Sequence, residues 1–198
     1  MKRTVVIPML LLAAFALTRW PGVMPLNFSV AYGLVFCAGA FPRRLPWWAI
    51  FGTMLATDIG LNVFYYDAVI FSDYQAVNYI AYAAIFLLGR LFSARASLLK
   101  HIGGGLIGAV LFYLITNTAS WLQDPAYAKN FTDWLRALTI GTSGWPETWT
   151  FFRNTLLSGG LFAGLISAAL QATEAREPEP EEEKEPQAVP EPAPEEAK

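Results

Sequence analysis

The residues best suited to binding chemistry are polar side chains that interrupt long apolar stretches. Asp58 and Asn62 lie four residues apart in one stretch, and Asn117 and Trp121 repeat that spacing in another. Residues four apart share one face of a helix. Polar groups inside a bilayer tend to face the bundle interior, pair with one another or mark a ligand path. The predicted solute-binding residues are Asn27, Asp58, Asn62, Asn117, Trp121, Arg153 and Asn154.

Two of these residues have specific predicted roles. Arg153 is expected to bind a carboxylate or phosphate, and Trp121 to stack on a flat heterocyclic ligand. An equally open interpretation is an internal salt bridge between Asp58 and Arg153 that joins two helices. The tryptophans predicted on the same side also fit an interfacial aromatic belt. They are Trp20, Trp121, Trp134, Trp145 and Trp149.

The apolar body lacks the usual residues of catalysis. His101 is the only histidine and Cys37 the only cysteine, and no cluster has metal-ligand spacing. Gly103, Gly105 and Gly108 match a dinucleotide-binding spacing, but that motif must follow a strand, and here the glycines open a predicted membrane helix. They are interpreted as a close-packing face. The sequence therefore predicts no enzyme, no metal and no cofactor.

Composition separates the chain into two parts. Hydrophobic residues make up 55% of the 198 positions and charged residues only 15%, against about a quarter charged in soluble domains. Residues 1–173 hold 11 Lys/Arg and 6 Asp/Glu, whereas residues 174–198 hold 3 and 10. This pattern excludes an ordinary soluble enzyme, a nucleic-acid binder and a disulfide scaffold. It predicts a transmembrane domain over 1–173 and a disordered Pro/Glu-rich tail over 174–198.

Six apolar stretches predict an all-α membrane protein, a bundle of six transmembrane helices in the lipid bilayer. A crossing helix needs about 20 mostly apolar residues, and some of the stretches are short. Lys2 and Arg3 followed by Val5–Leu17 also fit a cleaved secretory signal. The six stretches are Thr4–Thr18, Asn27–Phe41, Pro46–Phe64, Val77–Phe92, Ile102–Leu122 and Thr150–Gln171.

Loop charges predict the orientation. With six crossings, seven cationic residues of the body fall on one side, among them Arg43, Arg44 and Arg95, and four fall on the other, including Arg19 and Arg153. The side richer in Lys and Arg is normally cytoplasmic. The predicted location is therefore a bacterial inner membrane, with both termini in the cytoplasm and the candidate binding residues toward the outer face.

Several short segments resemble an uncharacterised bacterial family of integral membrane proteins. They are Pro25-Leu26-Asn27-Phe28-Ser29, Gly39-Ala40-Phe41-Pro42-Arg43-Arg44, Asp58, Leu88-Gly89-Arg90, Thr116-Asn117 and Phe152-Arg153-Asn154-Thr155-Leu156-Leu157-Ser158-Gly159. That family is in turn similar to the substrate-binding subunits of energy-coupling factor vitamin transporters.

The resemblance implies a subunit that captures a vitamin-like solute from outside. Its implied partners are a coupling transmembrane subunit and two cytoplasmic ATPases, which would explain why this chain has no P-loop of its own. The alternative function is a non-catalytic scaffold of the cell envelope, whose acidic tail recruits a cytoplasmic partner.

Overall fold

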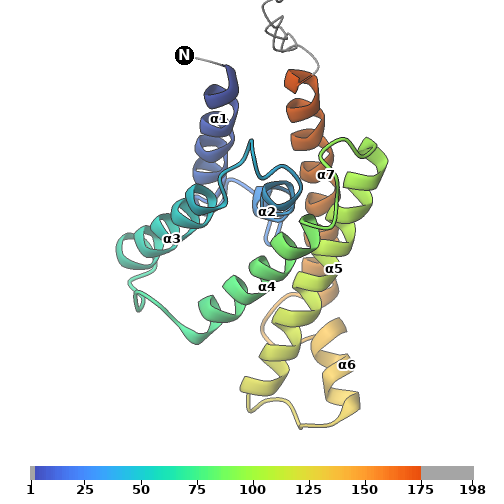
Figure 1. The fold of residues 1–198 in the computed structure, drawn as a ribbon. Coiled ribbons are helices and arrows are strands. Elements are labelled where there is room, and N and C mark those ends of the chain that lie inside the picture. Colours follow the sequence, from blue (N-terminus) through green and yellow to red (C-terminus); the bar gives the residue numbers. More distant parts are fainter. Residues whose placement is uncertain (1–2, 175–198) are drawn as a thin grey trace, which may run out of the picture.

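The computed structural model describes residues 3–174, which form an all-helical bundle without a strand (Figure 1). The predicted tail lies outside the described residues, except for Glu174. The helices are α1 (Arg3–Thr18), α2 (Val30–Ala40), α3 (Trp47–Phe64), α4 (Asp73–Gly89), α5 (Leu98–Gln123), α6 (Phe131–Thr139) and α7 (Thr148–Glu174).

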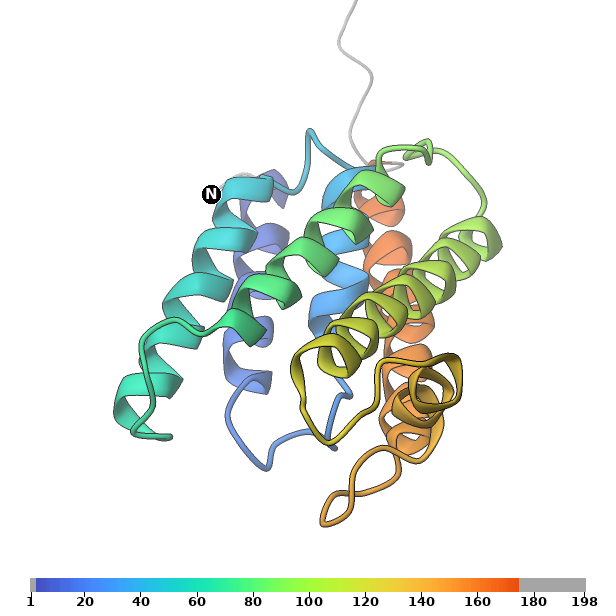
Figure 2. The ribbon, with the colours of Figure 1, turned by 90° about the horizontal axis from the view of Figure 1, so that it is seen from below.

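Helix α2 is the centre of the bundle. Ser29 caps its first turn by accepting a hydrogen bond from the Ala31 amide, and every residue of Val30–Ala40 is buried. Because α2 is apolar on all sides, it must be covered on all sides. Helices α4, α5 and α7 pack around it, and α1 and α3 complete the bundle at its periphery (Figure 2).

Glycines set how closely the central helices approach. An added Cβ on Gly39 or Gly89 would lie within 3.0 Å of backbone atoms of α4 or α2, respectively, and one on Gly105 would meet the backbone of α7 equally closely. Small residues of this kind let helix backbones touch where larger side chains would separate them. The predicted close-packing face is present at Gly105 and Gly108, and the neighbouring Gly104 also meets another helix. The prediction is wrong for Gly103, where an added Cβ would meet nothing within 4 Å.

The six predicted stretches correspond to α1–α5 and α7, with ends shifted by up to four residues. By length and composition, two helices are apolar and long enough to cross a membrane, Leu98–Gln123 and Thr148–Thr173, rather than six. Helix α2 has only 11 residues, or about 16 Å of helix. The predicted stretch ran further because Asn27–Phe41 includes the capping residue Ser29 and a connection that is not helical.

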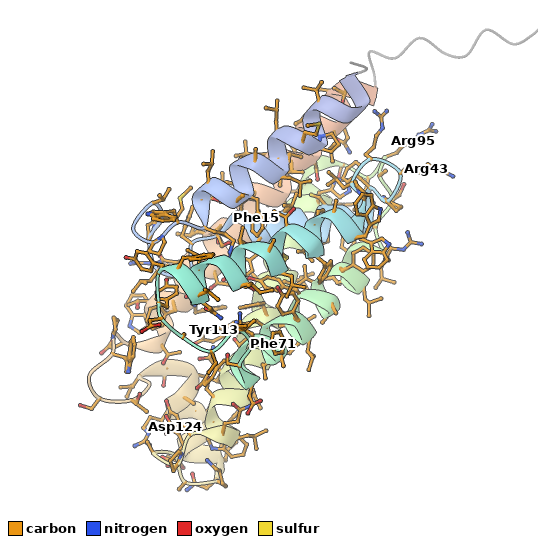
Figure 3. The ribbon with its side chains drawn as sticks, turned by 90° about the vertical axis from the view of Figure 1, so that its left-hand side faces the viewer. Phe15, Arg43, Phe71, Arg95, Tyr113 and Asp124 are labelled. Carbon is orange, nitrogen blue, oxygen red and sulfur yellow. The ribbon has the colours of Figure 1, made fainter. Side chains whose placement is uncertain are left out.

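The two ends of the bundle differ in charge. Arg43 and Arg95 lie together at the end where α1 begins, and Asp124 lies at the opposite end (Figure 3). The first end holds the α2–α3 and α4–α5 connections. The second end holds the α1–α2 connection, the α3–α4 connection and α6 (Figure 2). The arginine-rich connections thus share one end, as the loop-charge argument expects.

Candidate functional site

A cavity of about 600 Å³ opens at the end of the bundle that carries α6. Its walls come from the α1–α2 connection, the α3–α4 connection and helices α2, α4, α5 and α7. This volume is in the usual range for small-molecule sites. The lining includes Thr18, Arg19, Trp20, Asn27, Phe28, Ser29, Tyr32, Tyr66, Tyr74, Asn78, Tyr82, Phe112, Thr116, Asn117, Ser120 and Phe151.

Aromatic rings and uncharged polar groups share the walls. Tyr32, Tyr82 and Phe112 form a buried ring cluster at the cavity floor, with the Tyr32 and Tyr82 rings each 4.9 Å from the Phe112 ring, centre to centre. Within residues 3–174, the side chains of Asn78 and Ser120 and the Tyr82 hydroxyl have no hydrogen-bond partner. Asn78 and Ser120 are half-buried and Tyr82 is 8% exposed, so these groups line the cavity with hydrogen-bonding capacity that a ligand could use.

One ion pair closes the side of the cavity. The Nη2 atom of Arg19 donates to Oδ1 of Asp58, and the Tyr79 hydroxyl donates to the other carboxylate oxygen at 2.8 Å. The Arg19 side chain is 21% exposed and the Asp58 side chain is 13% exposed. Arg19 also lies over the Phe15 ring, 5.6 Å from its centre. Through Asp58 and Tyr79, Arg19 joins the end of α1 to α3 and α4.

The predicted pairing of Asp58 with Arg153 is wrong. Arg153 is exposed on the first turns of α7, where its guanidinium lies 5.5 Å from the centre of the Trp149 ring. It does not line the cavity. The partner of Asp58 is instead Arg19, because the chain turns directly after α1 and brings Arg19 alongside α3. Loop charges alone do not distinguish these two arginines, since both fall on the same predicted side.

Three other predicted binding residues hold connections in place instead of lining the cavity. The Asn62 amide donates to the carbonyls of Val69 and Ile70 at 3.1 and 3.3 Å. The Asn154 amide donates to the Leu26 carbonyl at 2.9 Å. The Trp121 indole N–H donates to the Ala128 carbonyl at 2.9 Å, so its polar edge is used within the α5–α6 connection.

Two predicted residues do line the cavity. Asn27 is exposed and has a left-handed backbone (φ 59°), which asparagine tolerates better than most residues. Asn117 faces the cavity from α5, where its amide nitrogen donates to the Tyr113 carbonyl at 2.9 Å. This bond uses one N–H and leaves the side-chain carbonyl available to a ligand.

Helix α6, which the sequence reading missed, supports the cavity end from outside. Asn130 caps it by accepting from the Asp133 amide at 2.8 Å, and the Trp134 indole donates to the Thr118 hydroxyl at 3.0 Å. Burial raises the pKa of the Tyr127 hydroxyl. The Arg136 guanidinium lies over this ring, 4.9 Å from its centre. The Asn130 cap and Asp133 were the signals for this helix.

Sequence reasoning also missed most of the cavity lining. Tyr66, Tyr74, Asn78 and Tyr82 come from segments in which no charged pair or polar repeat marked them. Arg19 offered one signal, its place directly after an apolar stretch on the same predicted side as Asp58. Among residues 3–174 no group of three His, Cys, Asp or Glu is arranged to hold a metal.

Comparisons with known proteins identify the family of the chain. Neither functionally curated proteins nor solved structures give a match. A family model does match, over residues 1–181, and its description is a family of unknown function, DUF6580. That range includes all seven helices. The chain therefore belongs to the family of unknown function DUF6580.

Proposed function

We propose that this protein is a membrane-embedded subunit that binds a small, uncharged, vitamin-like solute in the 600 Å³ cavity and delivers it for uptake. The observation that carries the proposal is the set of unpartnered polar groups in an aromatic-walled cavity. Asn78, Ser120 and Tyr82 line it with no hydrogen-bond partner in the described part of the chain. A ligand with several donors and acceptors would satisfy them.

The exposed surface supports a bilayer location. Large apolar side chains lie exposed on α1, α3 and the α4–α5 connection, including Leu17 at 72%, Phe64 at 88% and Leu91 at 80%. Extended apolar surface of this kind is unusual on a soluble monomer. Helices α5 and α7 are long enough to cross a bilayer. We propose that the shorter helices lie within the membrane around them, giving six spans with α6 at the outer interface.

The proposed orientation places the cavity on the outer side of a bacterial inner membrane. Arg43 and Arg95 lie at the opposite end of the bundle (Figure 3), and the arginine-rich side is normally cytoplasmic. A cavity that opens outward captures a solute before it is moved inward. The proposal includes a coupling membrane subunit and cytoplasmic ATPases as the partners that would drive release.

The charge of the cavity defines the class of solute. Arg19 is the only charged residue among its lining residues, and Asp58 neutralises it. An anionic ligand would compete with Asp58 for the guanidinium and leave a partly buried carboxylate without its partner, which is costly. An uncharged solute with a flat ring avoids this cost and can stack on the aromatic walls.

Ligand-dependent thermal stabilisation tests the proposal. The purified protein is screened against vitamins and their precursors, because a compound that binds only the folded state raises the unfolding midpoint. Ser120→Phe, which puts a large ring into the cavity, should abolish the shift. Arg153→Ala is the matched control and should retain it, since Arg153 lies outside the cavity. No shift with any compound at high concentration would contradict the proposal.

A further inference from the structure

A second hollow adjoins the cavity, between α1 and α3. It has a volume of about 260 Å³ and shares Arg19 and Trp20 with the larger cavity. We call it the α1–α3 crevice. Figure 3 shows α1 and α3 lying side by side at the near edge of the molecule, with Phe15 between them. The crevice is lined by Ala16, Arg19, Trp20, Thr57, Gly60, Leu61, Phe64 and Tyr65.

The crevice differs from the cavity in chemistry. Few of its lining residues carry polar side-chain atoms. The Thr57 hydroxyl donates to the carbonyls of Thr53 and Met54, each at 2.9 Å, whereas Arg19 Nε is buried with no hydrogen-bond partner among the described residues. Arg19 is held by Asp58. The remaining walls are aliphatic, aromatic or glycine, and the edge of the Trp20 ring meets Tyr65 with centres 5.7 Å apart. The crevice therefore suits an apolar group.

The space in the crevice depends on Gly60. This residue lies inside α3, yet a Cβ built on it would meet no atom within 4 Å. Gly52, two turns earlier in α3, has an equally open Cβ position but lies outside the crevice. The Cβ of a leucine would meet no atom at either position, and only Gly60 lines the crevice.

We infer that the solute is an uncharged amphiphile, with a polar ring in the cavity and an apolar chain in the α1–α3 crevice. This inference is based on the cavity and the crevice sharing two lining residues, Arg19 and Trp20. The inference rests on the proposed function and narrows its ligand class. A chain placed this way leaves along the outermost helices, so it does not cross the packed core around α2.

A chain-length series of n-alkyl β-D-glucosides, from methyl to octyl, tests the inference. The protein is held in an amphipathic polymer, the glucosides are kept below the concentration at which they form micelles, and the unfolding midpoint reports binding. Burial of each methylene should raise the apparent affinity by about three- to fourfold, until the crevice is filled. This dependence should appear in the wild type and in Gly52→Leu, and be lost in Gly60→Leu.

Every outcome bears on the inference. Loss of the chain-length dependence only in Gly60→Leu supports it, provided that both variants have wild-type midpoints without ligand. No dependence in the wild type, or the same dependence in Gly60→Leu, overturns it. The vitamin screen is repeated on Gly60→Leu to separate the two proposals. A chain-free vitamin that stabilises this variant keeps the proposed function even if the crevice inference fails.

Discussion

At the scale of single residues, the ion pair of Arg19 and Asp58 has the clearest consequence for stability. Asp58 accepts from both Arg19 and Tyr79, so it links three segments of the chain. Removing one member of a largely buried pair leaves the other charge without compensation. Both side chains retain some exposure, which lowers that penalty because solvent screens the charge.

We predict that Asp58→Asn lowers the free energy of unfolding by about 1–3 kcal/mol, because it leaves the Arg19 guanidinium without its counter-charge. Reversible denaturation in detergent measures this change. Arg153→Met removes an exposed charge on α7 and should change stability by less than about 0.5 kcal/mol. The double variant Arg19→Met/Asp58→Leu should recover most of the loss. Equal effects of Asp58→Asn and Arg153→Met would contradict the pairing seen here.

From the sequence, Asp58 could be identified as a buried charge that needs a partner, but the partner itself could not be identified. An acidic residue inside an apolar stretch has few tolerable environments, so its type and position were enough to single it out. Its partner depends on how the chain turns after Thr18, where Arg19 Nη2 reaches Asp58. Asn62 and Asn154 could not be placed for a similar reason, since backbone carbonyls of other segments, Val69 and Leu26, accept from their amides away from the cavity.

At the scale of helices, close packing depends on particular glycines. A Cβ on Gly89 would meet the Phe36 carbonyl oxygen of α2 well inside van der Waals contact. Backbone atoms yield far less easily than the end of a flexible side chain. The α2–α4 crossing is therefore intolerant of a single added methyl group.

We predict that Gly89→Ala destabilises the protein by about 1–3 kcal/mol through this overpacking. Gly103→Ala is the matched control, because a Cβ there would meet nothing within 4 Å. Since alanine is the better helix former, Gly103→Ala should be neutral or stabilise by up to about 1 kcal/mol. The unfolding midpoints of the two variants check this contrast, and a tolerated Gly89→Ala would mean that α2 and α4 are further apart.

The positions of the long helices could be predicted better than their exact ends or the short helix α6. Long apolar runs fix where a helix lies in the sequence, and all six predicted stretches correspond to observed helices, with ends shifted by up to four residues. The second stretch was too long, since Asn27 has a left-handed backbone and Ser29 begins the helix by capping it. Helix α6 was missed because its nine residues are amphipathic and too short to register as a span.

At the scale of the whole molecule, the two functional interpretations differ in their dependence on the tail. Binding in the cavity uses side chains of residues 18–151, whereas the scaffold alternative relies on the acidic segment beyond the helices. We predict that a chain truncated after Glu174 binds its solute with unchanged affinity, as titration of the unfolding midpoint would measure. A truncated chain that folds but has lost its function in cells would favour the scaffold.

The central claim is that the cavity opens to the outside and holds the solute, and side-specific labelling of Ser120→Cys measures both at once. Cys37 is fully buried and contributes little background. A membrane-impermeant maleimide should label Ser120→Cys in intact cells, and a compound that stabilises the protein should slow this reaction. Ser97→Cys, at the opposite end of α5, should react only after the membrane is permeabilised. Labelling of Ser120→Cys only after permeabilisation, or at a rate that the stabilising compound leaves unchanged, would contradict the account.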